Sequence, residues 1–470
     1  MLQLLPSEVQ LLIAQHLGTA DKAALVLTSH HFYSLVIPSL YENIENTYDQ
    51  GLMRLVDTLA RNPSLRAFPR SLTLEAWDTP STDNPADVWI DPHEEELDFP
   101  GYRLGLLCRL AKAACPVENE AVTWCRHLRN SNADALLALI LTLVPNLFRL
   151  EVQFPKSVGW VQRVIEWAVA QAQPIASLGA LQRLKEVYVS AQWLEFQDKN
   201  QDVTRWTLMF LGLPSLRRIT TDGLFHDEDE TMYKSTSSSV TQIRLDYSIG
   251  VYDLDRLIRH CPNLESYRHH YSVRSRRRHF LNPRELYPGF LLASHSLKEL
   301  WLDIFPTFII KSDSGVHWQT FKTFPLLELL HVPYFLLGQY KADTLADLAA
   351  MLPSSLKKLH VTEIDKTTLE SVLRSCLEYV LVAPAQLSQL IIATMSTLAD
   401  RDGIMTAVEM DTNRRIPDLT PAERAAPAIK YATELSTRCS PLGIRFGIYE
   451  PQRSNVLAPW APFDPFEEAR

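Results

Sequence analysis

The sequence predicts an α/β protein in which a module of three short helices at the N-terminus is followed by an irregular solenoid of parallel strands and outer helices. Two observations support this prediction. The first about forty residues contain three short apolar segments separated by helix-ending signals. From about residue 60 onward, a phrase of the form apolar-x-x-apolar-x-apolar recurs at intervals of 24 to 37 residues.

The first helix is predicted to begin at Pro6 and to run to Leu17. Proline fits the first helical position, because the N–H that it lacks would have no partner there. Glu8 places a negative charge in the first turn, close to the positive end of the helix dipole. Gly18 follows as a helix stop, so both ends of this helix are marked in the sequence.

Two further helices are predicted before residue 38. Thr19 or Asp21 can cap the second helix, and Ser29 can cap the third. The third helix is expected to end at Ile37, because the residue before Pro38 is disfavoured in the helical conformation. A unit of about forty residues is too small to bury its own apolar side chains, so these must be covered by the rest of the chain or by another protein.

Eleven residues of the N-terminal module carry a resemblance to a known family: Leu5, Pro6, Glu8, Ile13, Leu17, Asp21, Leu25, Leu27, Ser29, Phe32 and Leu35. Over residues 3–44 the module resembles the F-box, which predicts an F-box domain at residues 1–44. F-boxes bind the Skp adaptor of SCF-type (Skp–cullin–F-box) ubiquitin ligases, so the resemblance implies that these residues, apart from Asp21 and Ser29, contact or shape the adaptor-binding surface. Phe32 stands where the family often has tryptophan. An ordinary amphipathic helical cap on a larger domain is the alternative interpretation.

Nine phrases predict nine strands, since the last two apolar positions alternate as one buried strand face requires. The middle residues of the phrases are Leu150, Val187, Ile219, Ile243, Tyr267, Leu300, Leu330, Leu359 and Leu390. Leu72-x-Leu74 suggests an earlier strand, and the alternation at residues 444–448 suggests a last one. Helices are expected before several phrases, as at residues 132–144 and 253–260, and a later one through Ala432 and Leu435.

The intervals lie near the leucine-rich-repeat period of about 20 to 29 residues and scatter above it, which predicts a degenerate leucine-rich-repeat-like domain over residues 45–450. Acidic inserts are expected near residues 78–103 and 227–239, and residues 451–470 are expected to be disordered. An unrelated layered α/β domain is the alternative. An F-box followed by such repeats resembles fungal F-box/leucine-rich-repeat proteins, in which the repeats are taken to bind the substrate.

Composition excludes several classes of function. The chain has 470 residues and a net charge of −9, which argues against general binding to nucleic acids. No signal-peptide pattern is present, and the longest apolar run is about ten residues, so we expect a soluble protein in the cytoplasm, the nucleus or both, with no membrane association.

No sequence pattern points to a catalytic or cofactor site. No phosphate-binding loop is present, and no cofactor is expected. Cys108, Cys115, Cys125 and His127 lack the short spacing of structural zinc sites, so buried structural cysteines are favoured over zinc.

A basic stretch stands out in this acidic protein and consists of Arg268, Arg274, Arg276, Arg277 and Arg278, with His269, His270 and His279 among them. It could bind an acidic or phosphorylated segment of a substrate, because arginine clusters hold such groups by paired hydrogen bonds. A nuclear-import signal and a solvated loop balanced by the acidic inserts are alternatives.

The sequence and the resemblance together suggest a non-enzymatic substrate-recognition adaptor of an SCF-type ubiquitin ligase. It would bind the Skp adaptor, and through it a cullin-RING ligase, with the N-terminal module, and an unknown protein substrate with the repeats. The alternative is an F-box scaffold that acts with the Skp adaptor outside a ligase. A hydrolase hidden in the repeats would need a nucleophile and a base in one pocket, and no motif proposes them.

Overall fold

A computed structural model describes most of the chain. The described residues are 5–46, 49–74, 101–154, 159–191, 201–222, 237–248, 254–271, 283–303, 320–337, 348–364, 369–382, 386–394 and 427–449. They fall into two compact units: unit 1 comprises residues 1–264 and 274–277, and unit 2 comprises residues 265–273 and 278–470.

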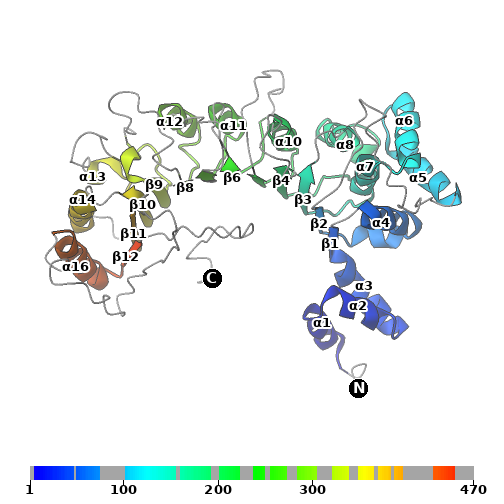
Figure 1. Ribbon diagram of the computed structural model, residues 1–470, viewed down its shortest axis with the longest axis horizontal. Helices are drawn as coiled ribbons and strands as arrows, with labels where there is room; N and C mark the ends of the chain where they lie inside the picture. The colour runs from blue at the N-terminus through cyan, green and yellow to red at the C-terminus, as the bar shows by residue number, and fades with distance from the viewer. Residues whose placement is uncertain are drawn as a thin grey trace, which may run out of the picture. The chain divides into compact units, whose positions relative to one another are not determined.

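Unit 1 begins with three helices, α1 (Ser7–Gln15), α2 (Thr19–Val26) and α3 (His30–Glu42) (Figure 1). The predicted cap of the third helix is confirmed, since the Ser29 hydroxyl accepts a hydrogen bond from the Phe32 N–H at 3.2 Å. The other predicted ends differ by a few residues. Pro6 is the N-cap of α1 and not its first helical residue, α1 stops at Gln15, and Gly18 takes the N-cap position of α2.

The third helix does not end at Ile37 as predicted, but passes through Pro38 to Glu42. Burial explains the difference, because Val36 and Ile37 are 0% and 8% exposed and hold this turn of the helix against its neighbours. The end of α3 is also fixed from outside, since the Glu42 carbonyl accepts a hydrogen bond from the Arg70 N–H at 2.8 Å. Tertiary contacts therefore outweigh the local cost of proline in the helix.

Eight more α-helices and one 3₁₀ helix are described in unit 1. They are α4 (Asp49–Arg61), η2 (Pro63–Ala67), α5 (Gly101–Ala114), α6 (Glu118–Arg129), α7 (Ala133–Leu143), α8 (Trp160–Val169), α9 (Ile175–Leu178), α10 (Gln201–Leu211) and α11 (Leu254–His260). Every residue of α7 is buried, which identifies this apolar helix as the core of the unit. The helices predicted over residues 132–144 and 253–260 are confirmed as α7 and α11.

Unit 1 has six described strands. They are β1 (Asn43–Asn46), β2 (Ser71–Leu74), β3 (Arg149–Phe154), β4 (Glu186–Ala191), β5 (Arg218–Asp222) and β6 (Gln242–Ser248). Each strand pairs in parallel with the next one along the chain. The middle residues of successive phrases lie in register, as for Leu150, Val187 and Ile219.

Unit 2 continues the same pattern. Its described strands are β7 (Ser266–Tyr271), β8 (Glu299–Asp303), β9 (Leu329–Pro333), β10 (Lys358–Ile364), β11 (Gln389–Thr394) and β12 (Arg445–Tyr449), again parallel and in chain order. Its described helices are α12 (Pro283–Leu292), η6 (Tyr334–Leu336), α13 (Leu348–Met351), α14 (Leu369–Val382), α16 (Pro427–Cys439) and η7 (Ser440–Leu442). The helix predicted through Ala432 and Leu435 is confirmed as α16.

The strand predictions are confirmed. The middle and last apolar positions of all nine phrases lie on strands, as do Leu72-x-Leu74 on β2 and residues 445–448 on β12. Strand β1 was not predicted. Within unit 1, Figure 1 shows α10 and α11 on one side of the strands. The apolar phrase positions are buried, and the side chains between them form the opposite surface, which we call the open face.

Three predicted segments fall mostly or wholly outside the described residues. Residues 78–100 of the first acidic insert lie outside the described residues, while residues 101–103 form the start of α5 and not a loop. Residues 227–236 of the second acidic insert and residues 451–470 of the expected tail also lie outside. Among the helices of the described ranges, none has the length and apolar character needed to cross a bilayer.

Candidate partner-binding surfaces

The N-terminal module exposes large apolar side chains on all three of its segments. The exposed fractions are 40% for Leu5, 38% for Val9, 57% for Leu12, 87% for Leu27 and 48% for Tyr33. The first three are spaced by four and three residues, so they lie on the same side of α1 and its entry. Exposed apolar surface of this kind typically marks a binding site for another protein.

The residues named by the resemblance differ in exposure. Those open to solvent are Leu5, Pro6, Glu8 and Leu27, and those partly buried are Ile13, Leu17, Leu25 and Leu35. Phe32 is only 5% exposed, so in the free chain it shapes the module from within. Val9, Leu12 and Tyr33 are exposed but carry no part of the resemblance.

A polar contact that the sequence does not reveal holds α1 against α3. The Gln10 side chain donates to the Leu5 carbonyl at 2.6 Å, and its oxygen lies 2.7 Å from Nε2 of His31. Gln10 itself is 3% exposed. Because Gln10 and His31 are 21 residues apart, no local pattern could have predicted the contact. It fixes the position of the exposed residues on α1 relative to α3.

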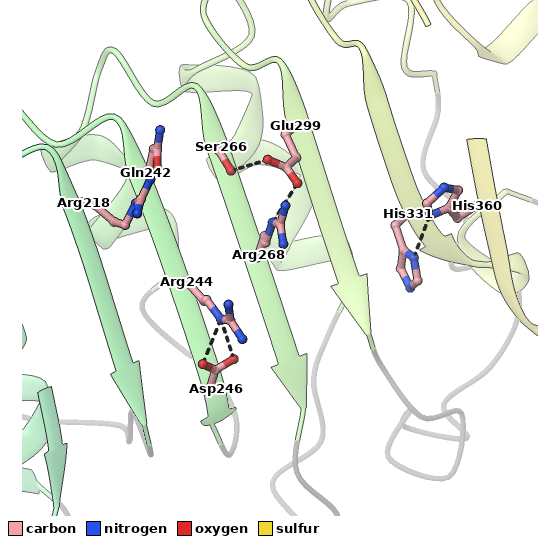
Figure 2. A network of polar contacts seen from close by, with 9 residues as sticks. All are labelled: Arg218, Gln242, Arg244, Asp246, Ser266, Arg268, Glu299, His331 and His360. Carbon is pink, nitrogen blue, oxygen red and sulfur yellow. Dashed lines mark hydrogen bonds and ion pairs between the residues drawn. The ribbon is translucent and has the colours of Figure 1, made fainter. Parts of the chain in front are cut away.

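The open face of unit 1 carries paired charges (Figure 2). Arg218 lies 3.3 Å from a carboxylate oxygen of Glu186 on β4 and donates to the Gln242 side chain on β6 at 2.7 Å. On β6, Arg244 donates to both carboxylate oxygens of Asp246, at 3.1 and 2.9 Å. These side chains are partly exposed, so each pair contributes little to stability. Their pairing gives a polar surface of balanced charge.

The open face of unit 2 carries a row of stacked side chains in register. Arg268, Trp301, His331, His360 and Ile391 occupy equivalent positions on β7 to β11. The Arg268 guanidinium lies 5.5 Å from the centre of the Trp301 ring. The ring centroids of Trp301 and His331 are 3.8 Å apart with 10° between their planes, and Nδ1 of His331 lies 3.3 Å from Nδ1 of His360.

One arginine of the predicted anion patch is described, and it has partners. Arg268 donates to Oε1 of Glu299 at 2.7 Å, and Oε2 of the same carboxylate accepts from the Ser266 hydroxyl at 2.7 Å (Figure 2). The other residues of the patch, Arg274, Arg276, Arg277 and Arg278, lie outside the described residues. A substrate anion at Arg268 would therefore have to compete with Glu299.

The two histidines next to Arg268 are not a simple extension of the basic stretch. His269 is fully buried on the helix side of β7, with Nδ1 3.4 Å from the Tyr267 hydroxyl. Burial lowers the pKa of His269 to about 3, and the neighbouring His270 adds to this shift, so His269 is neutral at pH 7. His270 pairs with Asp303 at 3.3 Å. Both histidines were predicted to belong to the basic stretch. For His269 this prediction is wrong, because its side chain is buried and neutral at pH 7.

The cysteines lie in the interior of the protein, as expected for structural residues. All six are buried and none forms a disulfide. Cys108 and Cys125 lie back to back, each Sγ within 3.9 Å of the other residue's carbonyl oxygen. Burial raises the pKa of Cys125 to about 11, which disfavours the reactive thiolate. No cluster of three or more potential metal ligands occurs within the described ranges.

The row of rings in unit 2 could have been found from the sequence. Trp301, His331 and His360 each occupy the position between the last two apolar residues of three successive phrases. Aligning the phrases by their apolar positions places the three rings side by side on one strand face.

Comparison with protein-family models matches residues 110–416 to a leucine-rich repeat domain. A search of curated proteins finds no match. The matched residues include α6 to α11 of unit 1 and most of unit 2, and they include both polar surfaces described above.

Proposed function

The chain belongs to the leucine-rich repeat domain family, and from this premise we propose that it is the substrate-recognition subunit of an SCF-type ubiquitin ligase. Its N-terminal module binds the Skp adaptor, and its repeats bind a protein target. The ubiquitin-transfer chemistry belongs to the partners in the complex.

The observation that carries this proposal is the exposed apolar surface of the N-terminal module. Leu12 and Leu27 are 57% and 87% exposed in a module of three helices. Exposed leucines are costly in water, and covering them by a partner releases about 25 cal/mol for each Å² of apolar area. The module therefore has the surface chemistry of a protein-docking site, in agreement with the F-box resemblance, to which Leu27 belongs.

The geometry of the module also suits docking, because its helices are held in place before a partner arrives. The contact between Gln10 and His31 joins α1 to α3, and the Ser29 cap fixes the start of α3. A surface that is already ordered loses less conformational entropy on binding.

The repeats supply the surface for the target. Leucine-rich repeat domains are typically protein-interaction modules, and the open faces of both units carry polar and aromatic side chains. Within the described ranges, no cluster of metal ligands suggests metal-dependent chemistry on these faces. Target capture therefore agrees with both the family and the surface.

The test is co-purification of the full chain with the Skp adaptor. Replacing Leu5 and Pro6 together by Ala, or replacing Leu27 by Asp, should abolish co-purification. Val122→Asp is the matched control, because Val122 is also exposed in unit 1 (54%) but lies on α6, outside the module. Undiminished binding by the folded Leu27→Asp variant would contradict the docking model.

A second experiment separates the ligase subunit from a scaffold that acts with the Skp adaptor outside a ligase. When the chain is depleted from cells, at least one protein that binds the repeats should accumulate. The reason is that a ligase subunit promotes the degradation of its target. Rescue with the Leu27→Asp variant should fail to restore the low level. If no binding protein changes in abundance while adaptor binding persists, the scaffold is the correct function.

A further inference from the structure

Three polar atoms on the open face of unit 2 are buried without a hydrogen-bond partner among the described residues. They are Nε1 of Trp301, Nε2 of His331 and Oγ1 of Thr362. All three residues are more than nine-tenths buried, with exposed fractions of 8%, 8% and 7%. A buried polar group without a partner destabilises the free chain, so three of them on adjacent strands suggest that a ligand supplies the missing partners.

A ligand that can both accept and donate hydrogen bonds suits these atoms. The Trp301 indole N–H can only donate, so it needs an acceptor. Nδ1 of His331 lies 3.3 Å from Nδ1 of His360 (Figure 2), so one of these two atoms donates a hydrogen bond and the other accepts it. A neutral imidazole has one donor and one acceptor nitrogen, so Nε2 of His331 has the role opposite to that of its own Nδ1. When His331 donates through Nδ1, its Nε2 is an acceptor, and the Thr362 hydroxyl can take either role.

A primary carboxamide satisfies this set of atoms for either tautomer of His331, and it brings no charge into the buried site. Its oxygen accepts from the Trp301 N–H, and its NH₂ group donates to His331 Nε2 when that atom is an acceptor; when Nε2 carries the proton, the carboxamide oxygen can accept from it as well. A carboxylate offers acceptors alone, so it fits only the second tautomer. It would also bring a negative charge into a buried place where the nearby Arg268 is already paired with Glu299. The site is therefore suited to a neutral polar group.

The position of these atoms favours the end of a side chain over a main-chain amide. The unpartnered atoms of Trp301 and His331 have almost no surface open to water, so only a narrow group can reach them. The terminal amide of a side chain is narrow enough to enter such a place. Strand β10, which carries His360 and Thr362, is also irregular, since its register shifts between Val361 and Ile364 and Glu363 has a φ of 57°. Bulges of this kind redirect side chains beside functional sites.

We propose that Trp301, His331 and Thr362 form a binding site for the carboxamide side chain of an asparagine or glutamine in the target protein. This inference deepens the proposed function and rests on it, because it names the kind of residue that the repeats recognise. It also differs from the acidic or phosphorylated substrate that the basic stretch suggested.

The test uses peptide libraries with a fixed central residue and randomised flanking positions. The purified full chain is immobilised, and the retention of libraries centred on Gln, Asn, Glu, Asp or Leu is compared. The Gln or Asn library should be retained about threefold to tenfold better than the library with the matching acid, as expected for one or two hydrogen bonds to buried groups. Equal retention of the five libraries, or preference for Glu or Asp, overturns the proposal.

Two variants assign the preference to this site. Trp301→Phe keeps an aromatic ring but removes the N–H together with part of the indole, and Thr362→Val keeps the shape and removes the hydroxyl. Each should lose the preference for the carboxamide. Thr362→Val should melt no earlier than the wild type, because it removes a buried polar atom that lacks a partner. Trp301→Phe should stay folded but melt somewhat earlier, because the smaller ring leaves a cavity. Trp160→Phe, on α8 of unit 1, is the control that should keep the preference.

The preference for the carboxamide should not depend on binding of the Skp adaptor. The Trp301→Phe variant should co-purify with the Skp adaptor as well as the wild type does. If the carboxamide preference is present but the adaptor does not bind, the proposed ligase function fails and the site remains. If both folded variants keep the wild-type preference, the site is wrongly assigned.

Discussion

Asp134 allows a quantitative test of how the helices of unit 1 are held together. This buried residue of α7 accepts hydrogen bonds from three consecutive N–H groups at the start of α8: those of Gly159 at 2.9 Å, Trp160 at 2.6 Å and Val161 at 3.0 Å. It thus caps a neighbouring helix, 25 to 27 residues away. Asp134→Ala leaves all three donors without this acceptor.

The expected magnitude follows from the number of donors. At about 1 kcal/mol net for each hydrogen bond, the loss of three lowers the free energy of unfolding by about 3 kcal/mol. For a unit of this size, 1 kcal/mol corresponds to about 2 °C, so the melting temperature should fall by about 6 °C. Asn132→Ala is the matched control, because Asn132 caps α7 through a single bond to the Ala135 N–H at 3.0 Å, and it should cost about 1 kcal/mol.

Thermal unfolding followed by near-ultraviolet circular dichroism is a suitable assay. The backbone N–H of Trp160 donates to Asp134, and the Trp160 ring stacks on Trp124 with ring centroids 5.3 Å apart and 11° between the planes. The stacked pair should give a signal that weakens when the start of α8 loosens. If Asp134→Ala costs no more than Asn132→Ala, the interpretation of Asp134 as a three-donor cap is refuted.

Three further predictions concern other parts of the chain. The pKa of His269 in the folded chain, about 3, lies below its unfolded value of about 6.5, so the contribution of neutral His269 to stability is complete above pH 6.5 and declines as the pH falls. The free energy of unfolding should therefore fall by about 2 kcal/mol between pH 7 and pH 5. Urea titrations of His269→Leu should lack this share of the pH dependence. Ser29→Ala removes the hydrogen bond to the Phe32 N–H and should lower the free energy of unfolding by about 1 kcal/mol in chemical denaturation; no change would show that the cap is dispensable. Glu299→Gln weakens a partly exposed ion pair with Arg268 and should cost about 0.5 to 1 kcal/mol, less at about 0.5 M salt, and a cost that does not depend on salt would contradict an ionic interaction.

The strands were predictable because the apolar alternation at the end of each phrase is a local signal. Strand β1 was missed for the same reason. Asn43–Asn46 contains one apolar residue, Ile44, and becomes a strand by pairing with Leu72 on β2, 28 residues later. The course of α3 through Pro38 also depends on tertiary packing. Local propensity cannot account for either feature.

The candidate binding surfaces were predictable in part. The resemblance named Leu27, and the structure shows that this is the most exposed of the large apolar residues described. It gave no reason to single out Gln10, whose contact with His31 depends on how the helices pack. It also could not show that Arg268 is already paired with Glu299, because that ion pair joins strands 31 residues apart in the sequence.

Docking of the N-terminal module onto the Skp adaptor is the central claim, and calorimetric titration of the purified full chain with that adaptor tests it most directly. We expect one-to-one binding with a dissociation constant of about 1 µM or lower and a negative heat-capacity change, since Leu12, Leu27 and Tyr33 would leave water. Leu27→Asp should weaken the affinity by at least about tenfold, and Val122→Asp should not. Absence of binding by the folded wild-type chain at about 100 µM adaptor, or equal affinity of the wild type and Leu27→Asp, would contradict the account.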